Sequence, residues 1–388
     1  MKRKQHIIGI LAFFVIVHLC GCIEKFEANL NEGSVDGLAI EGNIISDSTV
    51  VFQLSKTLPI QETENNMENF KDYLQVHAEL SVKGSDGSHW QGYGIGNGQY
   101  RVAIGTLQPE ETYHVEISYN DATYQSAPQK PLICSSIESL AYHQPHADAP
   151  VTVTLDTQGS NLNDTQYYLW FYEEDWEVHA LFASNKLYDL QENRIITYST
   201  PPYAQGWCYN AADEFILGTT ESKVGNRITG QKMVTIENTQ PQLSCLYSIR
   251  VQQRNLSREE YEYYQVRAKL NNEMGGLFTP QPTELPTNLT CSEPSRKVIG
   301  YVGCNMGVAY AQLYISTDEI NYLQNFNCDS GEGPAGSAAD KYIAGYQIAE
   351  FFEPNTYVWA KVKCVDVRSL GANPKGRPDW WPNPYVYE

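Results

Sequence analysis

Short runs of alternating apolar and polar residues follow one another along the chain from residue 37. The clearest run, Tyr113–Tyr119, places every second side chain on one face, which is typical of a β-strand with one buried side. Turn residues such as Gly84–Gly87 separate these runs. Evenly spaced short strands with turns between them predict an immunoglobulin-like (Ig-like) β-sandwich over residues 37–132.

Residues 133–388 continue the strand pattern and add one helix. Pro128 and Pro131 mark the boundary between the two regions. Ser257, followed three residues later by Glu260, is a capping box that predicts the start of a helix, and Gly275 is expected to end it. We therefore predict a mainly β protein, with an N-terminal Ig-like β-sandwich followed by a larger β-rich domain that carries one capped α-helix.

The N-terminal segment has the pattern of an export signal. Basic residues Lys2–Lys4 precede the apolar run Ile7–Leu19, which is shorter than the roughly 20 residues that a membrane-spanning helix needs. Leu19-Cys20-Gly21-Cys22 resembles the lipobox of bacterial lipoproteins, in which the leader is cut before the cysteine and the thiol is lipidated. We predict a signal peptide over 1–21, lipid attachment at Cys22 and a tether over 22–36; the alternative is an ordinary signal peptide cut elsewhere.

The charge of the chain limits its partners. Lys and Arg number 27 against 46 Asp and Glu, which gives a net charge of −19. Removing residues 1–21 takes away three basic and no acidic residues and leaves −22. Such a surface repels phosphate backbones, so nucleic-acid binding is not expected. An acidic body is not drawn to anionic lipid either, so the acyl chains must hold the protein at the membrane.

Cysteine usage agrees with export. Seven cysteines remain after the leader and Cys22 are set aside: Cys134, Cys208, Cys245, Cys291, Cys304, Cys328 and Cys364. None forms a C-x-x-C pair, so a zinc ribbon or a thioredoxin-like site has no support. In an oxidising envelope several of them should form disulfides, and an odd number leaves at least one thiol free. Their spacing leaves the pairing open.

Two clusters of titratable residues are candidates for chemistry. His143 and His146, with an aspartate two residues further on, could form half of a metal site, but nothing supplies further ligands and a polar linker is the favoured interpretation. Glu173–His179 contains four carboxylates, a tryptophan and a histidine, which could serve glycoside hydrolysis. Strand alternation, however, places Glu174 and Trp176 on one face and the other three carboxylates on the opposite face, which favours a strand with one solvated face.

The remaining motifs support no catalytic chemistry. Gly331–Gly336 matches G-x-G-x-x-G but follows no apolar strand, and we interpret it as a flexible loop. The chain has no G-x-S-x-G, Walker A or H-E-x-x-H motif. We therefore predict no catalytic residues, no metal and no cofactor. The aromatic clusters Trp207–Tyr209 and Trp380–Tyr385 could stack sugars or contact proteins, and docking onto the domain is favoured for the second.

Several landmarks together resemble the DUF4249 family of Bacteroidota outer-membrane lipoproteins. They are Leu38–Gly42, Tyr167–Glu177, Tyr247–Gln252, the helix around Glu260–Tyr264, Gly275–Pro282, Val298–Val302, and the end of the chain from Cys364 to Trp381. The resemblance covers nearly all of the chain after Cys22 and implies a disulfide between Cys328 and Cys364. It departs at Val367, where a second cysteine of a C-x-D-C motif is expected.

The function expected from this resemblance is binding rather than catalysis. Such lipoproteins are often encoded beside TonB-dependent outer-membrane transporters. We predict a lipid-anchored envelope protein of the outer membrane, on its periplasmic or its surface face, that captures substrate for such a transporter and is not an enzyme. The alternatives are an envelope hydrolase or metal-dependent enzyme built on Glu173–His179, and a surface adhesin.

Overall fold

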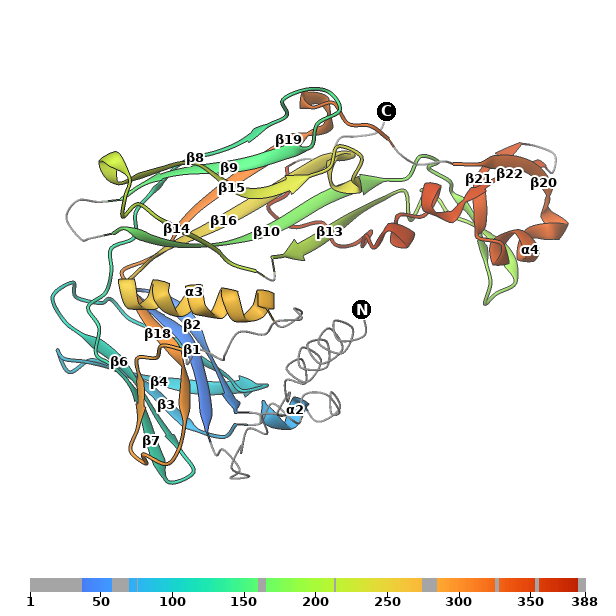
Figure 1. Ribbon diagram of the computed structural model, residues 1–388. Helices are drawn as coiled ribbons and strands as arrows, with labels where there is room; N and C mark the ends of the chain where they lie inside the picture. Colours follow the sequence, from blue (N-terminus) through green and yellow to red (C-terminus); the bar gives the residue numbers. More distant parts are fainter. Residues whose placement is uncertain are drawn as a thin grey trace, which may run out of the picture. The chain divides into compact units, whose positions relative to one another are not determined.

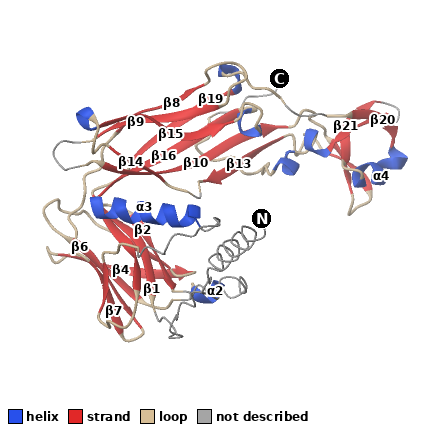
Figure 2. Cartoon of the chain, viewed as in Figure 1, coloured by secondary structure: helices blue, strands red, loops and turns tan. Residues whose placement is uncertain are grey.

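The fold is described from a computed structural model. It covers residues 37–57, 70–74, 76–159, 165–212, 214–273, 285–324, 328–352 and 356–382. The predicted signal peptide (1–21), Cys22, the tether up to residue 36 and the helix stop at Gly275 lie outside these residues. The described chain is mainly β, as predicted, with few helices (Figure 2). None of the helices in these ranges has the length and apolar character needed to cross a membrane.

Nine strands form one nearly closed sheet, in the order β17-β7-β6-β3-β4-β5-β2-β1-β18 (Figure 1). They are β1 (Leu38–Ile45), β2 (Thr49–Lys56), β3 (Glu79–Gly84), β4 (His89–Gly96), β5 (Gln99–Ala103), β6 (Tyr113–Tyr119), β7 (Ala122–Ser126), β17 (Leu289–Cys291) and β18 (Val298–Asn305). Strand β4 joins the half that contains β17, β7, β6 and β3 to the half that contains β5, β2, β1 and β18. Its first residues pair with β3, and its last residues pair with β5. One strand shared in this way turns the corner between two sheets of a sandwich.

Two strands of this sheet come from far along the chain. β18 pairs in parallel with β1 from Leu38↔Val298 to Ile45↔Asn305, and β17 pairs with β7. The predicted boundary near residue 132 therefore does not enclose the whole sheet. A parallel pair needs a long crossover connection, which in this case contains most of the second region, so local patterns cannot reveal it.

The second region is built around two further sheets. A five-stranded sheet contains β10 (Tyr167–His179), β13 (Gln205–Ala211), β14 (Ile216–Thr219), β16 (Leu246–Leu256) and β19 (Ala309–Ser316). A three-stranded sheet contains β8 (Ile137–His143), β9 (Val151–Gln158) and β15 (Arg227–Ile236). Side chains from both sheets, such as Val153 on β9 and Trp170 on β10, form one buried apolar cluster. The inner face of the five-stranded sheet is therefore occupied by the core.

The predicted helix is α3 (Arg258–Glu273), and its N-terminus differs from a capping box in one respect. The backbone amide of Glu260 donates to Ser257 Oγ at 3.1 Å, as expected. The Glu260 carboxylate, however, forms a buried ion pair with Arg254 of β16, with Oε1 3.0 Å from Nη1. α3 contacts β10, β14, β16 and β18, so this ion pair lies where the helix meets both large sheets. The other helices with described ends, α2 (Phe70–Tyr73) and α4 (Ala338–Ile343), are short.

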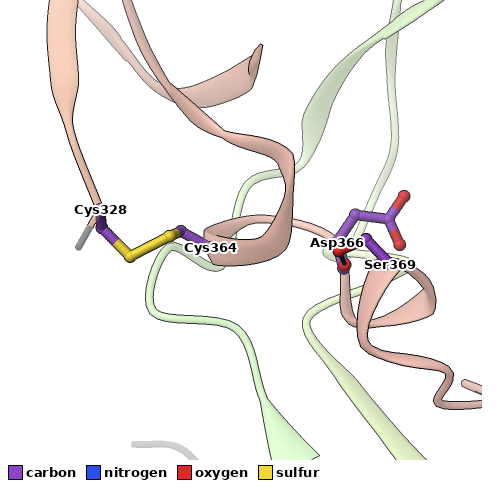
Figure 3. Close-up of a disulfide and its surroundings, with 4 residues drawn as sticks. All are labelled: Cys328, Cys364, Asp366 and Ser369. Carbon is purple, nitrogen blue, oxygen red and sulfur yellow. Dashed lines mark hydrogen bonds between the residues drawn. A yellow bond between two sulfur atoms is a disulfide. The ribbon is translucent and has the colours of Figure 1, made fainter. Parts of the chain in front are cut away.

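A smaller unit near the C-terminus is bounded by a disulfide. It contains β20 (Ser330–Pro334), α4, β21 (Tyr346–Phe352) and β22 (Thr356–Lys361), and it contacts the β11–β12 hairpin (Lys186–Asp189 and Arg194–Thr197). Cys328 and Cys364, the pair implied by the resemblance, form this disulfide (Figure 3). The expectation of a flexible loop over 331–336 is wrong, because residues 330–334 pair with β22.

The other cysteines that the structure describes form no disulfide. Among the described residues, five cysteines are free thiols: Cys134, Cys208, Cys245, Cys291 and Cys304. The prediction of several disulfides is therefore wrong for this part of the chain. Val367, where the family pattern expects a cysteine, is fully buried in an apolar cluster with Val178 and Cys208, so an aliphatic side chain fills that position.

The disulfide should stabilise the unit that it closes. Reducing it, or replacing both cysteines with alanine, should lower the free energy of unfolding of residues 328–364 by about 2–4 kcal/mol, because the link restricts a loop of this length in the unfolded chain. Hydrogen exchange of the β20–β22 amides should accelerate, while exchange in the nine-stranded sheet stays unchanged. Equal protection of β20–β22 before and after reduction would contradict this prediction.

Candidate functional site

Strand β10 divides its side chains between the two faces of the five-stranded sheet. Glu174 and Trp176 point to the core side, as alternation predicts. The Glu174 carboxylate is buried and accepts hydrogen bonds from the Tyr247 hydroxyl at 2.7 Å and from Asn210 Nδ2 at 2.8 Å. Both of its oxygens thus have donors from neighbouring strands, which is the environment of a structural carboxylate.

The opposite face of the five-stranded sheet is covered at both ends and open between them. We call the open part the aromatic face. Its residues are Phe171, Glu173 and Asp175 of β10, Tyr209 of β13, Arg250 and Gln252 of β16, and Tyr310, Gln312 and Tyr314 of β19. Three segments that were separate candidates in the sequence, Glu173–His179, Trp207–Tyr209 and Trp380–Tyr385, have residues on this side of the sheet. Tyr209 is the cross-strand neighbour of Asp175, and Tyr314 contacts the rings of Trp380 and Trp381.

Helix α3 covers one end of this sheet face. Leu169 and Leu256 are buried there in one cluster with Tyr261 and Tyr264 of the helix. Phe215 continues this cover, with its ring centroid 5.0 Å from that of Tyr264 and 6.5 Å from that of Phe171. The α3 end of the aromatic face therefore has an apolar wall.

The C-terminal segment covers the other end. Trp381 is buried, and its indole Nε1 donates to Glu177 Oε2 at 3.0 Å. Glu177 Oε1 also lies 2.5 Å from His179 Nε2 and accepts a hydrogen bond from Gln205. The predicted docking of the C-terminal tryptophans is confirmed for Trp381, and the expected solvated position of Glu177 is wrong because this segment covers it. The residues beyond Pro382 lie outside the described chain.

Between the two covers lies a hollow of about 380 Å³. Its lining includes Phe171, Glu173, Arg250, Gln252 and Tyr310. Phe171 is 39% exposed and Tyr310 is 60% exposed, while Arg250 and Glu173 form an ion pair in the adjacent cross-strand row. Exposed rings beside an ion pair and the Gln252 amide form a surface suited to binding, since they offer apolar contact and directional hydrogen bonds together.

Asp175 adds an acceptor to this surface. The pKa of its carboxyl is raised, because burial and the nearby Glu173 charge outweigh the opposing effect of the Arg250 charge. Within the described residues Asp175 forms no hydrogen bond, although it is only partly exposed. Its oxygens are therefore available to a ligand.

A thiol, a histidine and a carboxylate meet near the buried end, but their chemistry is not that of a nucleophilic triad. Burial and the Glu177 charge raise the pKa of the Cys245 thiol to about 12, so it stays protonated at neutral pH. Cys245 interacts with the backbone of His179, whose ring nitrogen lies against Glu177. This arrangement disfavours a reactive thiolate.

The candidate metal ligands His143 and His146 are both exposed at the β8–β9 connection. Gln144 fixes this connection, since its amide donates to the Ala149 carbonyl at 2.9 Å and its oxygen accepts from the Asn321 amide at 2.8 Å. Among the residues that the structure describes, no group of three or more His, Cys, Asp or Glu side chains could hold a metal ion.

Four residues of the hollow had no functional role predicted from the sequence: Phe171, Arg250, Gln252 and Tyr310. The sequence did contain a signal for Phe171 and Tyr310. Each lies in a strand whose alternate residues are mainly apolar, so its ring is expected to point away from the core. Their proximity was not predictable, since it depends on the order of β10, β16 and β19 in the sheet.

The Glu177 contacts predict a pH-sensitive attachment of the C-terminal segment. Burial alone would raise the pKa of Glu177, but hydrogen bonds from His179, Trp381 and Gln205 outweigh burial and lower it. A lowered pKa contributes stability that is present above the ordinary glutamate pKa of about 4.3 and is lost as the pH falls through the lowered value. Below about pH 4, Trp381 fluorescence should shift to the red as the ring reaches water, and Glu177→Gln should remove this transition. A transition that Glu177→Gln leaves in place would contradict this assignment.

The fold and the aromatic face define a mainly β protein with an open, side-chain-lined surface on its five-stranded sheet. The chain belongs to the family described as "Domain of unknown function (DUF4249)", whose model matches residues 23–306, more than half of the chain. The match contains β10, β13 and β16, whereas β19 and the C-terminal segment lie beyond it. No protein of curated function matches the sequence.

Proposed function

We propose that the protein is a lipid-anchored, non-catalytic component of the outer membrane that captures substrate for a TonB-dependent transporter. The observation that carries the capture role is the aromatic face, where exposed rings line a hollow on β10, β16 and β19. A rigid sheet presents such side chains at a low cost in conformational entropy, which favours binding.

The sequence supports the lipid anchor. A basic start, a short apolar run and Leu19-Cys20-Gly21-Cys22 stand in the order of a lipoprotein signal. The family match begins at residue 23, directly after the cysteine that would carry the lipid. The charge of −22 after removal of the leader leaves the acyl chains as the source of membrane attachment.

The contacts of the carboxylates favour binding over hydrolysis. Of the four in Glu173–His179, Glu174 and Glu177 are buried with two or more hydrogen-bond donors each, and Glu173 is paired with Arg250. If the protein were a hydrolase that depends on Glu174, Glu174→Gln would abolish an activity and leave the melting temperature unchanged. We expect instead that this substitution lowers the melting temperature.

Copurification and uptake test the proposal together. The protein, solubilised from membranes with a mild detergent, should retain a TonB-dependent transporter, and deletion of its gene should reduce uptake of that transporter's cargo. Cys22→Ser should release the protein from the membrane and reduce uptake to the same extent. Recovery of no transporter, with unchanged uptake in the deletion strain, would refute the proposal. Loss of cell attachment with unchanged uptake would point to an adhesin instead.

A further inference from the structure

We propose that the aromatic face binds a neutral oligosaccharide, with the sugar rings lying across β10, β16 and β19. This inference rests on the proposed function, because it names the chemical class of the captured substrate. It is argued from three properties of the face: the spacing of its rings, the kind of polar groups between them, and the balance of its charges.

The rings form a platform with a fixed spacing. Phe171, Gln252 and Tyr310 are direct cross-strand neighbours in one row, since Phe171 pairs with Gln252 and Gln252 pairs with Tyr310. Neighbouring strands lie about 4.8 Å apart, so the two aromatic residues stand about 10 Å apart with an amide between them. Sugar rings present flat patches of C–H groups that stack on aromatic faces, and a chain of sugars can reach both residues.

The polar groups between the rings match hydroxyl groups. In the next row Glu173, Arg250 and Gln312 are cross-strand neighbours on β10, β16 and β19. Together with Gln252 and Asp175 these side chains supply both N–H donors and carboxylate or amide acceptors. A sugar hydroxyl donates and accepts at the same time, so adjacent hydroxyls on one ring can use both kinds of group.

The charges favour a neutral ligand. Arg250 is already paired with Glu173, and the Asp175 carboxylate adds a negative charge without a basic partner of its own. An anionic ligand would meet this excess negative charge on a chain that is acidic overall. A neutral polyol pays no such electrostatic penalty.

An extended peptide fits this surface less well. Peptides that add to sheets pair with an unpaired strand edge. β10 and β16 are interior strands, whose backbone groups pair with neighbouring strands on both sides. β19, which carries Tyr310, is the last strand in the order of this sheet, so a peptide added to its outer edge would extend the sheet beside the hollow and would not lie across Phe171 and Gln252. Recognition here must therefore come from side chains, as in the binding of a sugar.

Binding by the purified full-length protein in detergent tests the proposal directly. Isothermal titration calorimetry would use maltohexaose, cellohexaose, xylohexaose and mannohexaose, with oligogalacturonate as the anionic comparison. At least one neutral oligomer should bind and oligogalacturonate should not. Phe171→Ala and Tyr310→Ala should each weaken binding by roughly three- to tenfold, the loss expected for one aromatic contact.

Matched variants separate stacking from folding. Tyr93 is an aromatic residue of β4 that is 67% exposed, and Tyr93→Ala should leave binding unchanged. Tyr310→Phe keeps the ring and should retain most of the affinity, while circular dichroism should show that each variant is folded at the temperature of the binding assay. Absence of binding to every neutral oligomer, or binding that survives the Phe171→Ala/Tyr310→Ala double variant, would overturn the proposal.

The result of the sugar-binding experiment can be distinguished from the result of the experiment that tests the proposed transport function. A transporter that copurifies and supports uptake, with no sugar bound at the aromatic face, would refute only the ligand class. Sugar binding that the ring variants abolish, with no transporter recovered, would refute only the transport role. The two experiments therefore fail independently.

Discussion

Replacing Arg254 with methionine should lower the free energy of unfolding by about 3–5 kcal/mol, because it leaves the Glu260 carboxylate buried without its partner. Both side chains are almost fully enclosed, and a Cβ at Gly303 would come within 2.6 Å of Glu260 Oε1 and 2.8 Å of Arg254 Nη1. The site has no space for a compensating side chain. Urea unfolding followed by circular dichroism would measure the loss.

The pH dependence of this loss identifies its cause. Burial already raises the pKa of Glu260 in the presence of the Arg254 charge, and removing that charge should raise it further. A raised pKa means that the folded state prefers the protonated acid, so the variant should recover stability as the pH falls and lose it as the pH rises. The double variant Arg254→Met/Glu260→Leu should regain most of the lost stability at neutral pH. A deficit that is independent of pH and remains in the double variant would assign the effect to packing.

The Glu260 contact also shows where prediction from the sequence ends. The Ser257 cap and the helix after it were predictable because both depend on residues that are close together in the sequence. The direction of the Glu260 side chain was not, since Arg254 reaches it only when β16 and α3 pack together. The same limit applies to β1 and β18, whose pairing joins residues about 260 positions apart.

In the candidate site, too, local features were predictable from the sequence and contacts between distant segments were not. Alternation in β10 correctly separated Glu174 from Glu173 and Asp175, because the direction of side chains along a strand is a local property. It could not show that Trp381 covers Glu177, since this contact joins segments 204 positions apart. For the residues of the aromatic face, the sequence therefore predicts on which side of the strand each side chain lies, but it does not predict which residues of other strands lie next to it.

Replacing Trp381 with alanine should release the C-terminal segment from the five-stranded sheet. Its buried ring contacts Tyr314 and Trp380, with ring centroids 6.3 Å and 5.5 Å apart, and truncation of a buried tryptophan typically costs about 3–5 kcal/mol. Because the loss falls mainly on one segment, limited proteolysis should cut within residues 371–382, while β10 and β16 stay protected. Hydrogen exchange at the Trp207 and Asn373 amides, which bond to each other's carbonyl oxygens, should accelerate.

Trp381→Phe separates the indole hydrogen bond from the packing of the ring. It keeps an aromatic ring but removes one donor to the Glu177 carboxylate, so it should cost about 1.5–3 kcal/mol, less than alanine. Combining it with Glu177→Gln should cost less than the sum of the two single changes, because the first change removes the donor and the second removes the charge of the acceptor of one hydrogen bond. Strict additivity would show that the ring alone holds the segment. If the coupling is present, the cover that the C-terminal segment forms at one end of the aromatic face depends on the ionised Glu177 carboxylate, and the shape of that end depends on pH in the acid range.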